Sequence, residues 1–192
     1  MTIKDKVFSN ADLSGKDWDK VQFKHCKLVG VEVKFANFSE CVFEYCDLTG
    51  VVLVNCNLTK CKFGGSKLND IEFSGVGIKE CDFEETVMMG CSWQQLRPGS
   101  KFLTKPFDLR GCRFTGTDMS NSVLVQCNLI EVNFDRANLA RVVFEKCNLT
   151  GARLVGANIE GVGWETATVK NTVVDMGGMV VLAQSRGFVL PE

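Results

Sequence analysis

The stretch from Cys41 to Gly65 reads CVFEY CDLTG VVLVN CNLTK CKFGG and repeats every five residues. Each block carries a large apolar residue at its centre and a small or β-branched residue two positions before it. A period of five matches neither the 3.6-residue turn of an α-helix nor the two-residue alternation of a strand. An internal repeat of this kind indicates a fold that is built from many similar units.

The same frame covers nearly the whole chain. It runs without a gap over residues 6–95 and has an apolar residue at every central position. After an interruption it resumes one residue out of phase at Phe107, and its last central residue is Val174. The two runs together hold thirty-two blocks of five, so the repeat predicts the architecture of almost the entire protein.

The cysteines follow this frame without exception. All ten lie two residues before a central residue, in a position that otherwise often holds alanine. We therefore expect cysteine to serve there as a small hydrophobic residue of the core. The ten are Cys26, Cys41, Cys46, Cys56, Cys61, Cys81, Cys91, Cys112, Cys127 and Cys147.

Composition places few limits on function. The chain has 192 residues, a hydrophobic content of 45% and a net charge of −1, which gives no general attraction to nucleic acid or membranes. No apolar run approaches the roughly 20 residues of a membrane helix. The N-terminus lacks the apolar core of a signal peptide, so we expect a cytoplasmic protein with reduced thiols.

The blocks ANFSE, CNLTK, ANLAR, CNLTG and ANIEG resemble the A(D/N)LxX signature of pentapeptide-repeat proteins. The resemblance implies an all-β fold, a right-handed quadrilateral β-helix over residues 1–174 with four blocks in each of about eight coils. The central and small positions point inward in this fold. Every twentieth residue then stacks, which predicts one core ladder of Phe23, Phe43, Phe63 and Phe83 beside another of Cys41, Cys61 and Cys81.

Catalytic and metal sites are not predicted. Stacked cysteines come within disulfide range, but their side chains point parallel to one another, whereas zinc needs four converging ligands. His25 is the only histidine and occupies an outward position, so no nucleophile and base can be paired. We expect no cofactor, no metal and no enzymatic activity, and a thiol-based redox sensor is the weakest alternative.

The segment Gln94–Asp108 departs from the repeat. Its Pro98-Gly99 and Pro106 indicate a loop, and it combines basic with apolar side chains. A loop of this composition on a stiff scaffold is typical of a recognition element, and a tolerated insertion without a partner is the alternative. The expected contact residues are Arg97, Lys101, Phe102, Leu103, Lys105 and Phe107.

The tail, residues 175–192, also departs from the repeat. Asp175 can act as an N-cap, Met179–Arg186 as a short helix and Gly187 as its stop. The tail is more apolar than a cap requires, which favours a symmetric homodimer through this end over a monomeric cap. The expected dimerisation residues are Met179, Val180, Leu182, Phe188 and Leu190.

The C-terminal end sharpens the resemblance. The run WETA at residues 164–167, Val174-Asp175 and the apolar helix before Gly187 are similar to the end of the MfpA and Qnr group. That group implies a dimeric, non-catalytic rod that mimics DNA, binds DNA gyrase and topoisomerase IV, and protects them from fluoroquinolones. It implies no direct contact with nucleic acid or membrane. A scaffold protein with a different partner is the alternative.

Charge differs between the two parts of the repeat. Residues 1–93 hold 14 acidic and 11 basic side chains, whereas residues 94–174 hold 7 acidic and 10 basic ones. A DNA mimic needs acidity on the face that meets its partner. Glu44, Glu84, Glu145 and Glu165 each follow a central residue directly, and whether they share a face depends on how the loop resets the register.

Overall fold

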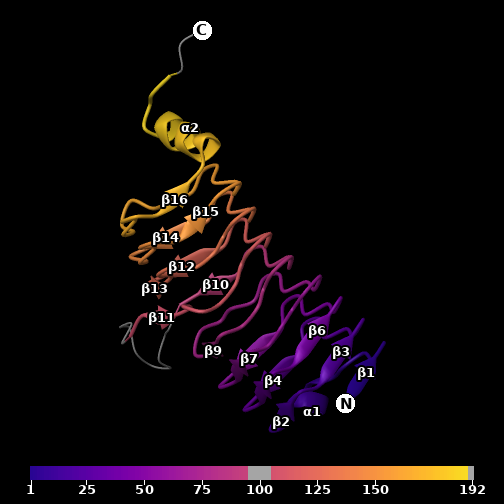
Figure 1. Cartoon of the computed structure of the whole chain (residues 1–192). Coiled ribbons are helices and arrows are strands. Elements are labelled where there is room, and N and C mark those ends of the chain that lie inside the picture. The colour runs from indigo at the N-terminus through magenta and orange to yellow at the C-terminus, as the bar shows by residue number, and fades with distance from the viewer. Residues whose placement is uncertain (95–104, 190–192) are drawn as a thin grey trace.

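The computed structural model describes residues 1–94 and 105–189, which form a parallel β-solenoid of about eight turns with a helix at its C-terminal end (Figure 1). The solenoid, its length and the terminal helix are as predicted. The chain winds as a stack of coils whose short strands recur at the same positions in successive turns (Figure 1).

The regular elements are short because the chain turns a corner every five residues. Before the insertion they are β1 (Thr2–Lys4), α1 (Asn10–Leu13), β2 (Asp17–Asp19), β3 (Gln22–Lys24), β4 (Glu32–Lys34), β5 (Asn37–Ser39), β6 (Val42–Glu44), β7 (Val52–Val54), β8 (Asn57–Thr59), β9 (Gly77–Lys79) and β10 (Ser92–Trp93). After it they are β11 (Phe107–Asp108), β12 (Val123–Val125), β13 (Cys127–Asn128), β14 (Val143–Glu145), β15 (Arg153–Leu154), β16 (Val173–Val174) and α2 (Met176–Ser185).

The register repeats every twenty residues, so each residue pairs with its counterpart in the next coil. Phe23 pairs with Phe43 between β3 and β6, in parallel. Across the insertion the spacing becomes 31, as between Ser92 of β10 and Val123 of β12. The insertion therefore adds eleven residues to one coil and then restores the same four columns of strands.

The core consists of the stacked central residues. The rings of Phe23, Phe43, Phe63 and Phe83 are parallel, with centroids 4.6 to 5.1 Å apart, which confirms the predicted ladder. Across the insertion Phe114 stacks on Phe83 with centroids 5.2 Å apart. All ten cysteines are buried, as predicted. Aromatic stacking thus continues through the junction where the sequence loses its phase.

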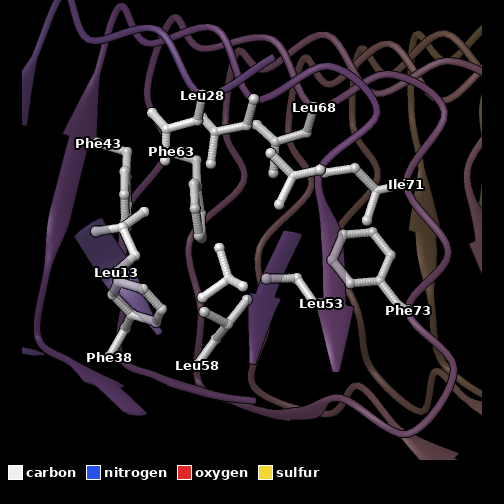
Figure 2. A pocket seen from close by; sticks show the side chains of 13 residues that line it. Leu13, Leu28, Phe38, Phe43, Leu53, Leu58, Phe63, Leu68, Ile71 and Phe73 are labelled. Atoms are coloured by element: carbon white, nitrogen blue, oxygen red, sulfur yellow. The ribbon is translucent and has the colours of Figure 1, made fainter. Parts of the chain in front are cut away.

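Inside the first coils the central side chains leave a small gap. Figure 2 shows Leu13, Phe43, Leu53 and Phe63 converging on it. Its volume is about 20 Å³, roughly the space of one water molecule, and the side chains that line it are all apolar. Water needs polar partners, so this cavity is a packing defect without a binding role.

The fifth residue of nearly every described block forms the corner in a left-handed conformation. Tyr45 (φ 53°) and Gly65 (φ 67°) occupy the same corner in successive coils. The Tyr45 ring lies over Gly65, where an added Cβ would come within 2.6 Å of Tyr45 Cε1. Gly65 is therefore needed both for its backbone conformation and for the space that Tyr45 occupies.

Two kinds of corner occur in the solenoid. In a closed corner the N–H three residues after the central residue donates to the central carbonyl, as Val31 N does to Leu28 O (3.0 Å) across Gly30. In an open corner this bond is missing, as between Cys46 and Phe43. There Ser66 in the next coil accepts from Cys46 N (2.9 Å) and donates to Phe43 O (3.0 Å).

The cysteines perform the same task as Ser66. The Cys41 thiol donates to Trp18 O (3.2 Å) and the Cys61 thiol to Phe38 O (3.4 Å), each in the preceding coil. Other cysteines bond in the same way to central carbonyls. The sequence pattern predicted small hydrophobic residues here and missed that they also satisfy buried carbonyl groups, which are costly to leave unpaired.

Candidate partner-binding surfaces

Two of the four solenoid faces carry the predicted acidic residues. We call the face over Phe23, Phe43, Phe63, Phe83, Phe114 and Phe134 the Phe83 face. The face over Val33, Leu53, Phe73, Trp93, Leu124, Phe144 and Trp164 is the Trp93 face. Both faces continue through the insertion, because the register is restored after it.

The four predicted glutamates divide between these faces. Glu44 and Glu84 lie on the Phe83 face, whereas Glu145 and Glu165 lie on the Trp93 face. The register thus answers the question that the sequence left open, and the four do not form one acidic strip. Any partner that met all four would have to contact two sides of the solenoid.

Basic side chains offset much of this acidity. Glu44 pairs with Lys24 (2.6 Å) and Glu84 with Arg113 (2.5 Å), while Glu145 lies 3.7 Å from Lys146. The hydrogen bond from Lys24 lowers the pKa of Glu44 below its usual value. These ion pairs make the Phe83 face less negative than its acidic residues alone would suggest.

The predicted recognition loop is described only at its ends. Arg97, Lys101, Phe102 and Leu103 lie outside the described residues. Lys105 is exposed, as expected of a contact residue.

Phe107 departs from the prediction, because it belongs to β11 and is 2% exposed. It fills the small inward position opposite Cys127 and packs near Trp93, so the solenoid resumes before the predicted end of the loop.

A groove opens beside the C-terminal root of this loop. It has a volume of about 360 Å³ and is lined by Pro106, Gln126, Cys127, Asn128, Lys146 and Asn148. Three carboxamides and one ammonium group contribute to its walls, together with Pro106 and Cys127. The repeat pattern placed Gln126, Asn128, Lys146 and Asn148 in ordinary outward positions and gave no sign that they border a hollow.

The C-terminal helix α2 follows the prediction closely. Asp175 caps it by accepting from Gly178 N (2.7 Å), and Gly187 (φ 85°) ends it. The helix begins at Met176, three residues earlier than expected, directly after its cap. The last turn is closed by a bond from Phe188 N to Ala183 O (3.1 Å), a Schellman arrangement.

The apolar residues of the tail divide into two groups. Val181 and Leu182 pack against the core, so Leu182 is engaged within its own chain. Met179 is 51% exposed and Phe188 is 68% exposed, and Val180 is half-buried. Leu190 lies outside the described residues. The exposed group is the surface through which the predicted dimer would form.

Burial makes two of the thiols unreactive. Burial raises the pKa of the Cys91 and Cys112 thiols to about 12, which keeps them protonated at neutral pH. Among residues 1–94 and 105–189, no cluster of three His, Cys, Asp or Glu side chains is arranged to hold a metal ion. Neither described helix is long and apolar enough to cross a membrane.

Comparison with solved structures shows which proteins share this fold. A trypsin-treated form of QnrB1, a plasmid-mediated fluoroquinolone resistance protein, matches all of this chain and 98% of its own at 16% identity, with a TM-score of 0.55. Full-length QnrB1 matches 97% of each chain at 14% identity, with a TM-score of 0.54. HetL, from the cyanobacterium Nostoc sp., matches 92% of this chain and 88% of its own at 19% identity, with a TM-score of 0.45.

Comparison with protein families identifies the repeat itself. No curated protein matches the chain in sequence. A model described as a pentapeptide repeat region matches residues 16–93, and a model of pentapeptide repeats in eight copies matches residues 108–145 and 127–162. These matches cover most of both runs of the five-residue frame and stop at the insertion. The chain therefore belongs to the pentapeptide-repeat family.

Proposed function

We propose that this protein is a non-catalytic, cytoplasmic homodimer that binds a type II topoisomerase, DNA gyrase or topoisomerase IV, and protects it from fluoroquinolones or a natural poison. The observation that carries the proposal is the likeness to QnrB1 over the full length of the chain. The resemblance of the C-terminal sequence to the MfpA and Qnr group supports the same proposal. At 16% identity the likeness is one of fold, so the function needs its own test.

The tail supports the dimer in this proposal. The solenoid presents an open end at its last coil, and α2 packs on it through Val181 and Leu182. Met179 and Phe188 remain outside this packing. Two copies that meet through these side chains would bury apolar surface that one copy leaves in water.

Measurement of molar mass by light scattering at tens of micromolar tests the dimer. Met179→Asp, which leaves the core contacts of Leu182 intact, should shift the mass toward that of one chain. Lys170→Asp, an exposed change outside α2, is the matched control. A native protein with the mass of one chain would contradict the dimer.

A supercoiling assay with DNA gyrase and ciprofloxacin tests the function. Added protein should restore supercoiling at drug concentrations that otherwise stop the enzyme. Supercoiling that stays equally sensitive to the drug at every protein concentration would refute the protective role. Binding of gyrase to the immobilised protein, measured in parallel, separates a failure to bind from a failure to protect.

The distribution of charge favours one second candidate, a scaffold with another partner. The acidic residues lie on two faces and are largely paired with Lys or Arg. A DNA mimic is expected to present one continuous acidic surface to a basic groove. Absence of any gyrase binding in the assay above would support the scaffold function.

A further inference from the structure

Stacked asparagine side chains in neighbouring coils form ladders in which they hydrogen-bond to one another. On one face Asn57 Nδ2 donates to Asn37 Oδ1 (2.8 Å), and Asn37 Nδ2 donates to Asp17 Oδ1 (2.7 Å). Elsewhere Asn158 Nδ2 donates to Asn138 Oδ1 (3.1 Å) in the same way. Each amide donor in such a ladder is satisfied by the coil before it.

The pair Asn128 and Asn148 breaks this rule. The two are stacked in neighbouring coils, yet neither Nδ2 group has an acceptor among the residues that the structure describes. Their oxygens are occupied, since Asn128 Oδ1 accepts from Ile130 N (3.4 Å) and Asn148 Oδ1 from Thr150 N (3.0 Å). What remains on each side chain is an N–H₂ donor.

The coil before Asn128 explains why the ladder fails here. Its counterpart is Asp108, which pairs with Asn128 in register. Both Asp108 oxygens are taken by the Arg110 guanidinium, at 2.9 Å from Nε and 2.7 Å from Nη2. In the regular ladder the carboxylate of Asp17 accepts from Asn37 of the next coil. The carboxylate of Asp108 is instead occupied by the bidentate pair with Arg110, so Asn128 is left without an acceptor.

The residues that carry the unused donors line the groove described above. Asn128 and Asn148 line it together with Lys146, whose side chain is 61% exposed. The groove thus offers two amide donors and an ammonium group, while its carboxamide acceptors on the two asparagines are already bonded. Donor-bearing side chains that line one hollow fit a ligand with acceptor oxygens, above all a carboxylate.

We propose that this groove binds an acidic segment of a partner protein, with a carboxylate held by Asn128 Nδ2, Asn148 Nδ2 and Lys146 Nζ. The net positive charge of this part of the chain fits an acidic ligand, because residues 94–174 hold 10 basic and 7 acidic side chains. The inference stands apart from the topoisomerase proposal, since it names the chemistry of the ligand and not the protein that carries it.

An NMR titration of the full chain with a hexaglutamate peptide tests this site. The side-chain amide signals of Asn128 and Asn148 should shift with one common dissociation constant, while those of Asn138 and Asn158, which donate within their own ladder, should stay in place. A hexaglutamine peptide should produce no shift at the same concentrations. Unmoved signals at Asn128 and Asn148, or equal shifts with hexaglutamine, would overturn the proposal.

Isosteric variants test the role of the donors. Asn148→Asp keeps an oxygen for Thr150 N but places a negative charge in the groove, so it should weaken hexaglutamate binding at least tenfold. Asn158→Asp makes the same change at a position whose oxygen likewise accepts a backbone N–H, from Glu160 (3.2 Å), and should leave binding unchanged. Equal binding by Asn148→Asp and the native chain would contradict the site.

Two further arms complete the test. Lys146→Gln, at an exposed side chain, should weaken binding without loss of folding, and unaltered affinity in this variant would also contradict the site. A short DNA duplex is the competing polyanion. Displacement of hexaglutamate by the duplex at lower concentration than by free peptide would reassign the groove to nucleic acid and overturn the peptide proposal.

Discussion

The solenoid holds its corners differently before and after the insertion. After it, most corners are closed by their own hydrogen bond, as Ala137 N donates to Phe134 O (3.0 Å) and Ala152 N to Leu149 O (2.9 Å). Before it, most corners are open, and the next coil supplies a thiol or hydroxyl for the central carbonyl. Seven of the ten cysteines precede the insertion for this reason.

This contrast shows that cysteine content here follows from backbone geometry. Where a corner closes itself, the small position of the next coil can hold alanine or valine, because the central carbonyl already accepts an N–H. Where a corner stays open, alanine would leave a buried carbonyl without a partner. The central carbonyls of the first part are thus paired mainly by side chains of the next coil, and those of the second mainly by an N–H of their own corner. Removal of such a side-chain bond should therefore be felt mainly in the first part, and after the insertion at Cys127 and Cys147.

Cys61→Asp should have the largest effect on stability. Cys61 is fully buried, and its thiol donates to Phe38 O. An aspartate would place a charge among apolar side chains without a cationic partner, at a cost of at least about 3 kcal/mol in the free energy of unfolding. Urea denaturation followed by circular dichroism measures the loss. A variant within 1 kcal/mol of the native chain would contradict the position of Cys61 in the core.

Ser66→Ala should have the next largest effect and tests the comparison directly. It leaves Cys46 N and Phe43 O unpaired, which should cost about 1–3 kcal/mol. Ala137→Ser is the matched control, since it introduces a hydroxyl in the same column above a corner that is already closed. It should not stabilise the protein. A stabilising Ala137→Ser, or a neutral Ser66→Ala, would remove the distinction between the two kinds of corner.

Arg113→Gln should have a smaller effect. Arg113 follows the insertion and pairs with Asp82 and Glu84 before it, so it joins the two parts by ion pairs. Its side chain is 58% exposed, which limits the contribution of these pairs to about 1 kcal/mol or less. The difference in denaturation midpoint from the native chain should shrink in high salt. A loss that persists unchanged in salt would point to packing by the side chain instead.

Lys24→Gln should have the smallest effect on stability, and the effect should be detectable as a change in the pKa of Glu44. The hydrogen bond from Lys24 lowers the pKa of Glu44, so its stabilising contribution is present above the unfolded value, about 4.3, and is lost as pH falls through the lower folded value. NMR titration should show the Glu44 pKa returning toward about 4.3 in the variant. An unchanged pKa would assign the shift to another group.

The sequence was most informative where the repeat is regular. Central and small positions predicted the core ladder from Phe23 to Phe83, since inward residues of a solenoid must be apolar and stack at a fixed interval. Asp175 and Gly187 predicted the ends of α2 through their capping chemistry. Local rules of this kind need no knowledge of distant residues.

The partner surfaces were less predictable, because they depend on register across the insertion. Glu84 and Glu145 occupy the same position in their blocks, yet they lie on different faces. The groove at Asn128 and Asn148 depends on Arg110 occupying Asp108, which no repeat pattern reveals. A glycine at the fifth position does not separate the two kinds of corner, because Gly30 lies at a closed corner and Gly90 at an open one, so the thiol bonds could not be predicted from it.

The most direct test of the functional account is gyrase supercoiling with ciprofloxacin in the presence of a chain that lacks residues 96–106. This deletion removes eleven residues, returns the spacing across the junction from 31 to the regular twenty, and joins Gln95 directly to Phe107 in the sequence. We expect the shortened chain to fold and form dimers, and to lose protection against the drug that the intact chain provides. Equal protection by the two chains would contradict the proposed role of the loop.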